Sequence, residues 1–207
     1  MTRITVDAAT FDGALARAAS TIRAGRIVAF PTDTLYALGV DPRSNEAVAA
    51  LFAAKGRTES QAVALIAASV EQAREVGEFT PLAERLASRW WPGPLTIIVA
   101  ARPGLAAALL GGSQTIGVRV PRHPLACALA ERCGTPVTST SANRSGQPPT
   151  ESPDVVARTL GDVVDLLLDQ GPSPGGAPST LVDATRSTPR LVRDGAVPWS
   201  RVLESVE

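Results

Sequence analysis

The chain has 207 residues, enough for one large domain or two small ones, and 44% of them are hydrophobic, so we expect a folded core. The 20 basic and 20 acidic residues balance, which argues against a protein that grips nucleic acid by bulk charge. No charged-then-apolar leader follows Met1, and no apolar run approaches the roughly 18 residues of a membrane span. We therefore expect a cytoplasmic protein without membrane contact.

The first quarter of the chain alternates apolar strands with a helix. The spacing of apolar residues predicts a strand over 4–6, a helix over 11–24 that ends at Gly25, and a buried strand over 26–30. Pro31 ends that strand, and the three residues that follow it are polar: Thr32, Asp33 and Thr34. Polar residues at a strand end either cap a following helix or face a ligand, and both interpretations stay open.

A second predicted helix, over 46–54, is followed by two cations. Its end reads Lys55-Gly56-Arg57. Cations are favourable at a helix C-terminus and glycine commonly ends a helix, so the tripeptide has an ordinary structural explanation. Two cations beside a residue without a side chain also suit a polyphosphate. The tripeptide alone does not separate these alternatives.

The middle of the chain continues the alternation. We expect a strand over 62–67, short helices over 69–76 and 80–89, a strand over 95–100 and a short helix over 105–110. Trp90 and Trp91 precede a proline corner, where large side chains form a core wall more often than a surface for stacking bases.

The segment TIGVRV, residues 115–120, alternates along a predicted strand. Thr115, Gly117 and Arg119 therefore share one face of the strand, opposite its apolar residues. An arginine inside a strand needs an anion, which is either a ligand or an internal carboxylate. His123 follows in a turn between prolines, and we interpret it as structural.

A run of hydroxyl side chains follows the predicted helix over 125–132. Val137 leads into Thr138, Ser139, Thr140 and Ser141, and Asn143 closes the run. A short apolar run that ends in hydroxyls and an amide is typical of a strand that delivers donors and acceptors to its carboxyl end, where open α/β sheets bind ligands. The alternative is a solvated Ser/Thr-rich turn.

The C-terminal quarter returns to short elements. We expect a helix over 152–160, strands over 164–168, 179–182 and 190–192, Arg193 at the last strand's end and a helix from Pro198. Residues 171–178 form a loose loop that can cover a site. The whole chain, 1–207, therefore predicts one α/β domain with a twisted, mixed parallel and antiparallel sheet flanked by helices. The glycine-rich nucleotide loops GxxxxGK[ST] and GxGxxG are absent from the sequence.

Seven motifs in this order resemble the threonylcarbamoyl-adenylate synthase family, the YrdC-like proteins. They read PTDTLYALG, KGR, WPGPLTIIV, TIGVRVPRHP, TSTSANRSG, APSTLVD and LVRDG, and they extend from about Ile22 to the C-terminal end. The resemblance implies a large concave cavity and the condensation of L-threonine, bicarbonate and ATP, with Mg²⁺, to threonylcarbamoyl-AMP and pyrophosphate. That product serves the modification of adenosine 37 in ANN-decoding tRNAs, through threonylcarbamoyl-transferase complex proteins that act with short members of the family.

The resemblance also assigns roles to residues. It implies that Lys55 and Arg57 are catalytic and hold the phosphates. With only two cysteines, six residues apart, and one histidine, the sequence itself predicts no resident metal site. The threonine-binding residues would be Thr34, Arg119, Ser139 and Ser179. The further nucleotide-binding residues would be Thr115, Ser141, Asn143 and Arg193.

The sequence departs from the family pattern at Ala37, Thr58 and Gln61. These departures leave the shape of the local loops open. One alternative is a paralogue of the same fold that acts on another carbamate or nucleotide.

A second alternative is an RNA-binding module with direct tRNA contact. Its basic concave face would consist of Lys55, Arg57, Arg119, Arg122 and Arg144. Binding to such a face would depend steeply on salt and would not need threonine.

Overall fold

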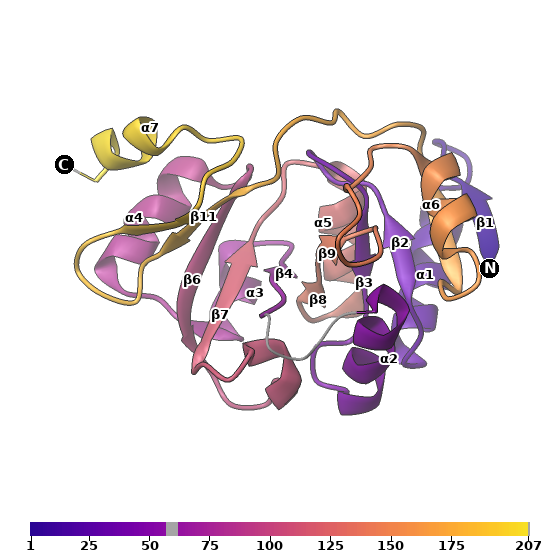
Figure 1. The fold of residues 1–207 in the computed structure, drawn as a ribbon, viewed down its shortest axis with the longest axis horizontal. Helices are drawn as coiled ribbons and strands as arrows, with labels where there is room; N and C mark the ends of the chain where they lie inside the picture. Colours follow the sequence, from indigo (N-terminus) through magenta and orange to yellow (C-terminus); the bar gives the residue numbers. More distant parts are fainter. Residues whose placement is uncertain (57–61, 207) are drawn as a thin grey trace.

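The computed structural model describes residues 1–56 and 62–206, and its strands and helices form a mixed α/β fold. This confirms the predicted fold class, but the strands lie in two sheets where the sequence predicted one. Figure 1 shows one sheet in each half of the molecule, with the N-terminus and the C-terminus at opposite ends of the long axis.

The first sheet has the strand order β1-β10-β2-β3-β9. β10 runs parallel to β1 and to β2, whereas β3 is antiparallel to both β2 and β9. The strands are β1 (Thr2–Thr5), β2 (Val28–Phe30), β3 (Ala37–Gly39), β9 (Thr140–Ser141) and β10 (Leu166–Asp169).

Strand β3 is an element that the sequence interpretation missed. Its three residues are too few to display alternation, and all three are buried. It folds back on β2 across the turn formed by residues 31–36, so the polar residues Thr32, Asp33 and Thr34 lie in a hairpin connection and not before a helix.

The second sheet has the order β12-β11-β6-β7-β4-β8, with β5 paired to β6 at the side. β11 is parallel to β6, and β6 is antiparallel to β7. The strands are β4 (Leu65–Ile66), β5 (Gly77–Glu78), β6 (Leu95–Ala101), β7 (Thr115–Arg119), β8 (Val137–Thr138), β11 (Thr180–Asp183) and β12 (Arg190–Arg193).

The hydroxyl-rich run connects the two sheets. Its first half, β8, pairs with β4 of the second sheet, and its second half, β9, pairs with β3 of the first sheet. Ser139 lies between them, and its N–H donates to the carbonyl of Ala64 at 2.8 Å. Because one short segment belongs to both sheets, the run that looked like a single strand end is the place where they meet.

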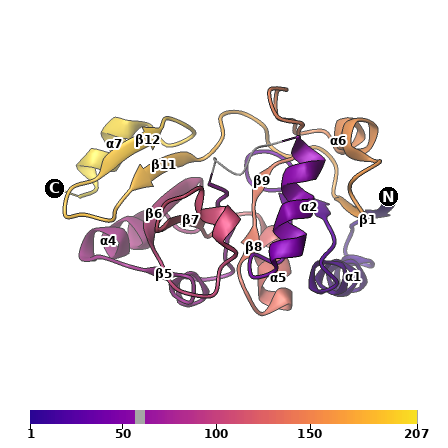
Figure 2. The same cartoon turned by 60° about the horizontal axis from the view of Figure 1, so that its bottom comes forward.

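Helices flank both sheets (Figure 2). They are α1 (Phe11–Arg23), α2 (Asn45–Lys55), α3 (Val70–Arg74), α4 (Pro81–Trp90), α5 (Pro124–Cys133), α6 (Pro153–Leu160), α7 (Trp199–Glu204) and the 3₁₀ helix η1 (Ala107–Leu110). In Figure 2, α1 and α6 lie near β1 of the first sheet, α4 and α7 lie beside the second sheet, and α2 and α5 lie in the middle of the view. The side-chain hydroxyls of Ser44, Ser69 and Thr80 accept backbone N–H bonds at the starts of α2, α3 and α4. Among the described residues, no helix is both long and apolar enough to cross a membrane.

The proline corner contributes to the core, as predicted. Trp91 is buried, its ring packs edge-on against Phe79 with the centroids 5.9 Å apart, and its indole N–H donates to the carbonyl of Leu95 at 2.7 Å. The corner therefore fixes the start of β6, which is one of the strands that carry the site.

Candidate active site

A cavity of about 400 Å³ lies where the two sheets meet. One side, which we call the floor, consists of side chains on one face of the second sheet: Ala64, Thr96, Ile98, Thr115, Gly117, Arg119 and Leu181. The opposite side, which we call the wall, consists of the cavity-facing residues of the segments 32–37 and 139–141. Pro149, Pro178, Ser179 and Arg193 form the rim.

The floor follows from the pleat of its strands. Thr115, Gly117 and Arg119 all face the cavity, as their alternation in the sequence predicted. Ile116 and Val118, between them, are buried in the hydrophobic core on the other face. The same pleat places Ile98 of β6 directly beside Gly117.

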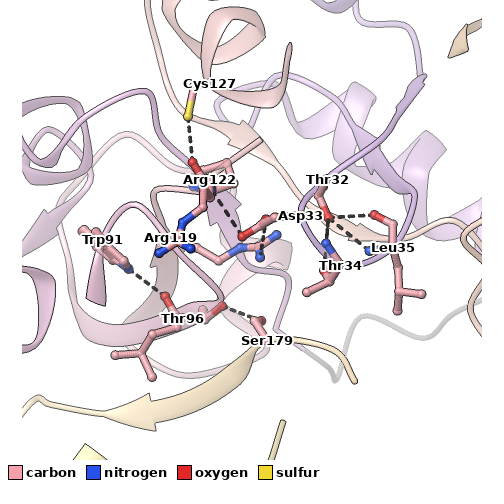
Figure 3. Close-up of polar contacts among 12 residues, drawn as sticks. Thr32, Asp33, Thr34, Leu35, Trp91, Thr96, Arg119, Arg122, Cys127 and Ser179 are labelled. Atoms are coloured by element: carbon pink, nitrogen blue, oxygen red, sulfur yellow. Dashed lines mark hydrogen bonds and ion pairs between the residues drawn. The ribbon is translucent and has the colours of Figure 1, made fainter. Parts of the chain in front are cut away.

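Arg119 is a buried cation with one carboxylate partner. Its side chain is 6% exposed, and its Nη1 donates to Oδ1 of Asp33 at 3.0 Å. Figure 3 shows Asp33 between the Arg119 side chain and the Arg122 backbone, whose N–H donates to Oδ2 at 3.2 Å. Burial lowers the pKa of Arg119, and Asp33 opposes that effect. The sequence had left a ligand and an internal carboxylate as alternatives, and the structure supplies the carboxylate while keeping Arg119 at the cavity.

The wall begins with a turn organised by Thr32. Its hydroxyl donates to the carbonyl of Leu35 at 2.7 Å and accepts the N–H groups of Thr34 and Leu35, each at 3.2 Å (Figure 3). The Thr32 and Thr34 hydroxyls lie 3.1 Å apart. This network orients Thr34 toward the cavity, so Thr32 is a site-forming residue that the motif PTDT contained but the residue assignments omitted.

Lys55 supports the wall from behind. It is 4% exposed, and its ammonium donates to the carbonyls of Ser141 and Asn143, the latter at 2.8 Å. The N–H of Ser145 donates back to the Lys55 carbonyl at 2.7 Å. The end of α2 is thereby fastened to the hydroxyl-rich segment.

Asn143 also belongs to this support. Its amide nitrogen donates to the carbonyls of Arg144 and Gln147, and its Oδ1 is buried with no hydrogen-bond partner among the described residues. An acceptor in that state is costly unless a donor reaches it, so Asn143 stays a candidate ligand residue behind the wall.

The rim is held by the C-terminal hairpin. Arg193 Nη2 donates to the Ser179 carbonyl at 2.8 Å and to its hydroxyl at 3.2 Å. The Ser179 hydroxyl lies 2.8 Å from that of Thr96 on the floor (Figure 3). A Cβ on Gly195 would clash with the Pro178 carbonyl oxygen, so the glycine of LVRDG allows the two segments to approach.

The loop over 171–178, expected to cover a site, is bonded to the wall. The Gly175 N–H donates to the Thr34 carbonyl at 2.9 Å, and the Tyr36 hydroxyl donates to the Gly171 carbonyl at 2.8 Å. Burial raises the pKa of Tyr36 to about 12, so its hydroxyl stays a donor at neutral pH. Pro178 at the end of this loop lines the cavity.

The structure brings most of the expected site residues together. Those that line the cavity are Thr34, Thr115, Arg119, Ser139, Ser141, Ser179 and Arg193. Lys55 and Asn143 lie behind the wall and are not in the described lining, whereas Arg57, Thr58 and Gln61 lie outside the described residues. Ala37, the other departure from the family pattern, is part of β3 and lines the cavity.

Sequence reasoning missed Thr96 and the support role of Lys55. Thr96 is the second residue of β6, and the alternation of LTIIV would have placed it on a face with Ile98. The contacts of Lys55 join residues far apart in the chain, so no local sequence pattern predicts them.

The charges of the cavity favour an anionic ligand. Its described lining contains the guanidinium groups of Arg119 and Arg193 and no carboxylate. Arg193 further lowers the pKa of Arg119, after the effects of burial and Asp33, so the two cations repel each other. A carboxylate or phosphate between them would relieve that repulsion.

The basic face expected of an RNA-binding module is not assembled. Lys55 and Arg119 are buried, and Arg144 pairs with Asp162 at 2.9 Å. Arg57 lies outside the described residues. Lys55 and Arg119 therefore lie too deep to present a surface to RNA, and Arg144 is paired with a carboxylate, which argues against that interpretation.

The fold and the cavity define a mixed α/β protein whose cavity between two sheets has the size and charge to suit a small, polar, anionic ligand. The family model Sua5/YciO/YrdC, whose description reads "Telomere recombination", matches residues 20–195. The chain belongs to this family.

Named relatives are similar over most of this chain. Threonylcarbamoyl-AMP synthase of Pyrococcus abyssi is 38% identical over 191 residues, 92% of this chain and 55% of the relative. The protein of the same name from Bacillus subtilis is 34% identical over 196 residues, 94% of this chain and 57% of the relative. The chain thus spans little more than half the length of these two relatives.

A solved structure is also closely similar. The structure of P. abyssi Sua5 complexed with L-threonine superposes with a TM-score of 0.95 at 34% identity, covering 100% of this chain and 61% of the other. The two-sheet architecture described above is therefore shared with that structure.

Proposed function

We propose that the chain is an L-threonylcarbamoyladenylate synthase that joins L-threonine, bicarbonate and ATP. The observation that carries the proposal is the cavity, in which Thr34, Ser139, Ser141 and Ser179 surround a space flanked by Arg119 and Arg193. Relatives that carry the synthase name, and one family structure with bound L-threonine, support the same reaction.

The proposed chemistry joins two anions. The threonine amine and bicarbonate form a carbamate with loss of water, and a carbamate oxygen then attacks the α-phosphorus of ATP. The P–O bond to the β-phosphate breaks, and pyrophosphate leaves with the electron pair. Since both reactants are negatively charged, positioned cations and hydrogen-bond donors are the main requirement of the site.

The residues divide between the two substrates in this proposal. Arg119 binds the threonine carboxylate, helped by hydroxyls of Thr34, Ser139 and Ser179. Thr115, Ser141, Asn143 and Arg193 face the nucleotide, and Lys55 and Arg57 are assigned to its phosphates. Because Lys55 already bonds to the backbone of Ser141 and Asn143, it would also fix the segment on which the phosphates rest.

Mg²⁺ is proposed as the companion of ATP. The described lining offers hydroxyl oxygens and no carboxylate, so the phosphates and water would supply most of the ligands of the ion. Its chemistry when bound is to neutralise phosphate charge. Lys55, Arg57 and the hydroxyls of the wall would then orient the α-phosphate toward the carbamate.

The decisive experiment is pyrophosphate release from ATP by the purified protein. Release that needs both L-threonine and bicarbonate, with formation of threonylcarbamoyl-AMP by mass spectrometry, is the expected result. Release without threonine, or none with all substrates and Mg²⁺ present, would overturn the proposal.

The place of the product is part of the same proposal. Threonylcarbamoyl-AMP would pass to threonylcarbamoyl-transferase complex proteins that modify adenosine 37 of ANN-decoding tRNAs, which would place the protein in the cytoplasm. The second candidate function is that of a paralogue with another amino acid or nucleotide. Release of pyrophosphate with a different amino acid, measured in the same assay, would favour it.

A further inference from the structure

Gly117 occupies the middle of the floor strand β7, where glycine needs a reason. A strand interior is weakened by glycine, because no side chain packs and the unfolded chain gains freedom. The φ angle of Gly117 lies outside the left-handed region, so the backbone conformation does not require glycine. The reason must lie in the space beside the residue.

The space above Gly117 is apolar. A Cβ at this position would lie 3.2 Å from Thr96 Cγ2, 3.5 Å from Ala64 Cβ and 3.6 Å from Leu181 Cδ1. All three neighbours line the cavity, as does Ile98, the residue paired with Gly117 on β6. The floor thus has a small hydrocarbon depression beside the hydroxyl and guanidinium groups of Thr115 and Arg119.

The depression suits one methyl group of a ligand. A Cβ at residue 117 would project into the cavity among these three carbons, so without a side chain a ligand methyl can rest on the exposed Cα of Gly117, in contact with them. Arg119 lies two residues further along the same face of β7, roughly 7 Å away along the strand. An amino acid whose carboxylate binds Arg119 can therefore direct a side-chain methyl toward Gly117.

We propose that Gly117, with Thr96, Ala64 and Leu181, forms a methyl subsite that selects L-threonine over L-serine. The inference rests on the proposed function, because the subsite would explain how the proposed synthase distinguishes L-threonine from other amino acids. One methyl group in an apolar pocket discriminates by about 10- to 200-fold. The absence of a side chain at residue 117 is what leaves room for it.

The test is the Gly117→Ala variant, assayed for pyrophosphate release with L-threonine, L-serine and L-allo-threonine. The added methyl occupies the subsite, so kcat/KM for L-threonine should fall about 10- to 100-fold, while kcat/KM for L-serine should change less than about 3-fold. The preference for L-threonine over L-serine should therefore approach 1. Wild-type protein should also reject L-allo-threonine, whose methyl and hydroxyl positions are exchanged.

Two controls separate this effect from damage to the fold. The melting temperature of Gly117→Ala should stay within about 3 °C of wild type, because alanine suits a strand at least as well as glycine. Gly13→Ala is the matched substitution, since Gly13 is exposed in α1 and a Cβ there meets no atom within 4 Å. It should leave the threonine-to-serine ratio unchanged.

The outcomes distinguish this inference from the proposed function. A wild-type protein that releases pyrophosphate with none of the amino acids refutes the proposed function and, with it, the subsite. An active wild type in which Gly117→Ala lowers L-threonine and L-serine use by the same factor, or lowers neither, refutes only the methyl subsite. Calorimetric titration of wild type and Gly117→Ala with L-threonine and with L-serine should show the same loss of preference in the two dissociation constants.

Discussion

The floor and the wall of the cavity present similar polar groups but are built in different ways. The floor takes its residues from strands whose pleat directs every second side chain into the cavity, and the intervening residues pack in the core. The wall consists of a turn and two short strand pieces held by side-chain to backbone bonds, including those of Thr32 and Lys55.

This difference predicts how each region responds to substitution. A floor side chain can be exchanged while the ladder of β6 and β7 keeps the backbone in place, so ligand binding should change more than stability. A wall side chain that bonds to the backbone shapes the cavity through that bond. Its exchange should lower stability and ligand binding together.

The largest effect is expected for Lys55→Met, which tests the wall. Methionine fills a similar volume but leaves the carbonyls of Ser141 and Asn143 without their charged donor. The free energy of unfolding should fall by about 2–3 kcal/mol, and pyrophosphate release should be nearly abolished. Urea unfolding and the release assay measure the two quantities.

Arg158→Met is the matched control for Lys55→Met. Arg158 is an exposed cation in the last turn of α6, so its loss should change stability by less than about 0.5 kcal/mol. Unchanged stability in Lys55→Met, with activity lost, would mean that Lys55 acts on the phosphates alone and does not support the wall.

Next in size is Arg119→Lys, which tests the floor. A lysine keeps the charge beside Asp33 but cannot form the two-pronged bond to a carboxylate. KM for L-threonine should rise roughly 10- to 100-fold, while KM for ATP should change only a few-fold. Initial rates with each substrate varied in turn decide this, and equal losses for both substrates would contradict the assignment of Arg119 to threonine.

The difference between floor and wall also explains which parts of the site could be predicted from the sequence. The floor could be predicted because the alternation of residues 115–120 fixes which side chains share a face. The helices over 46–54, 69–76 and 80–89 could be predicted for a similar reason, since apolar periodicity and a polar residue at the helix start are local patterns of a few residues. The motifs of the family resemblance assigned Thr34, Ser139, Ser141, Ser179 and Arg193 to the site, and these residues line the cavity.

The wall was harder to predict from the sequence, because its geometry depends on contacts between segments that are distant in the chain. Strand β3 is too short to show a pattern, and the division of 137–141 between two sheets follows from pairing with β4 and β3. The partner of Arg119 was left open for the same reason, because Asp33 lies 86 positions away in the chain. Such long-range pairings leave no periodic signal.

A moderate effect is expected for Thr32→Val, which removes one hydroxyl from the wall without changing its shape. The bonds to the Leu35 carbonyl and from the N–H groups of Thr34 and Leu35 are lost. Stability should fall by about 1–2 kcal/mol, and KM for L-threonine should rise about 3- to 10-fold, because Thr34 is released.

Thr21→Val is the matched control for Thr32→Val. It also removes a hydroxyl that donates to a backbone carbonyl, that of Arg17, but it lies in α1 away from the cavity. Its KM for L-threonine should equal that of wild type. If both variants behaved alike in the assay, the turn at Thr32 would have no part in shaping the site.

The smallest effect is expected at the junction of floor and wall, where His123 follows β7. Burial lowers the pKa of His123 and Asp33 only partly opposes this, so between pH 6.5 and the lowered value the unfolded state binds more protons than the folded state. Stability should therefore decrease as the pH falls through this range and recover above it. The contribution should stay below about 1 kcal/mol, since solvent screens a partly exposed group. Melting temperatures of wild type and His123→Gln, measured between pH 5 and 8, isolate the contribution of His123. The variant should lose this part of the pH dependence. Identical profiles would show that the imidazole does not titrate differently in the folded protein.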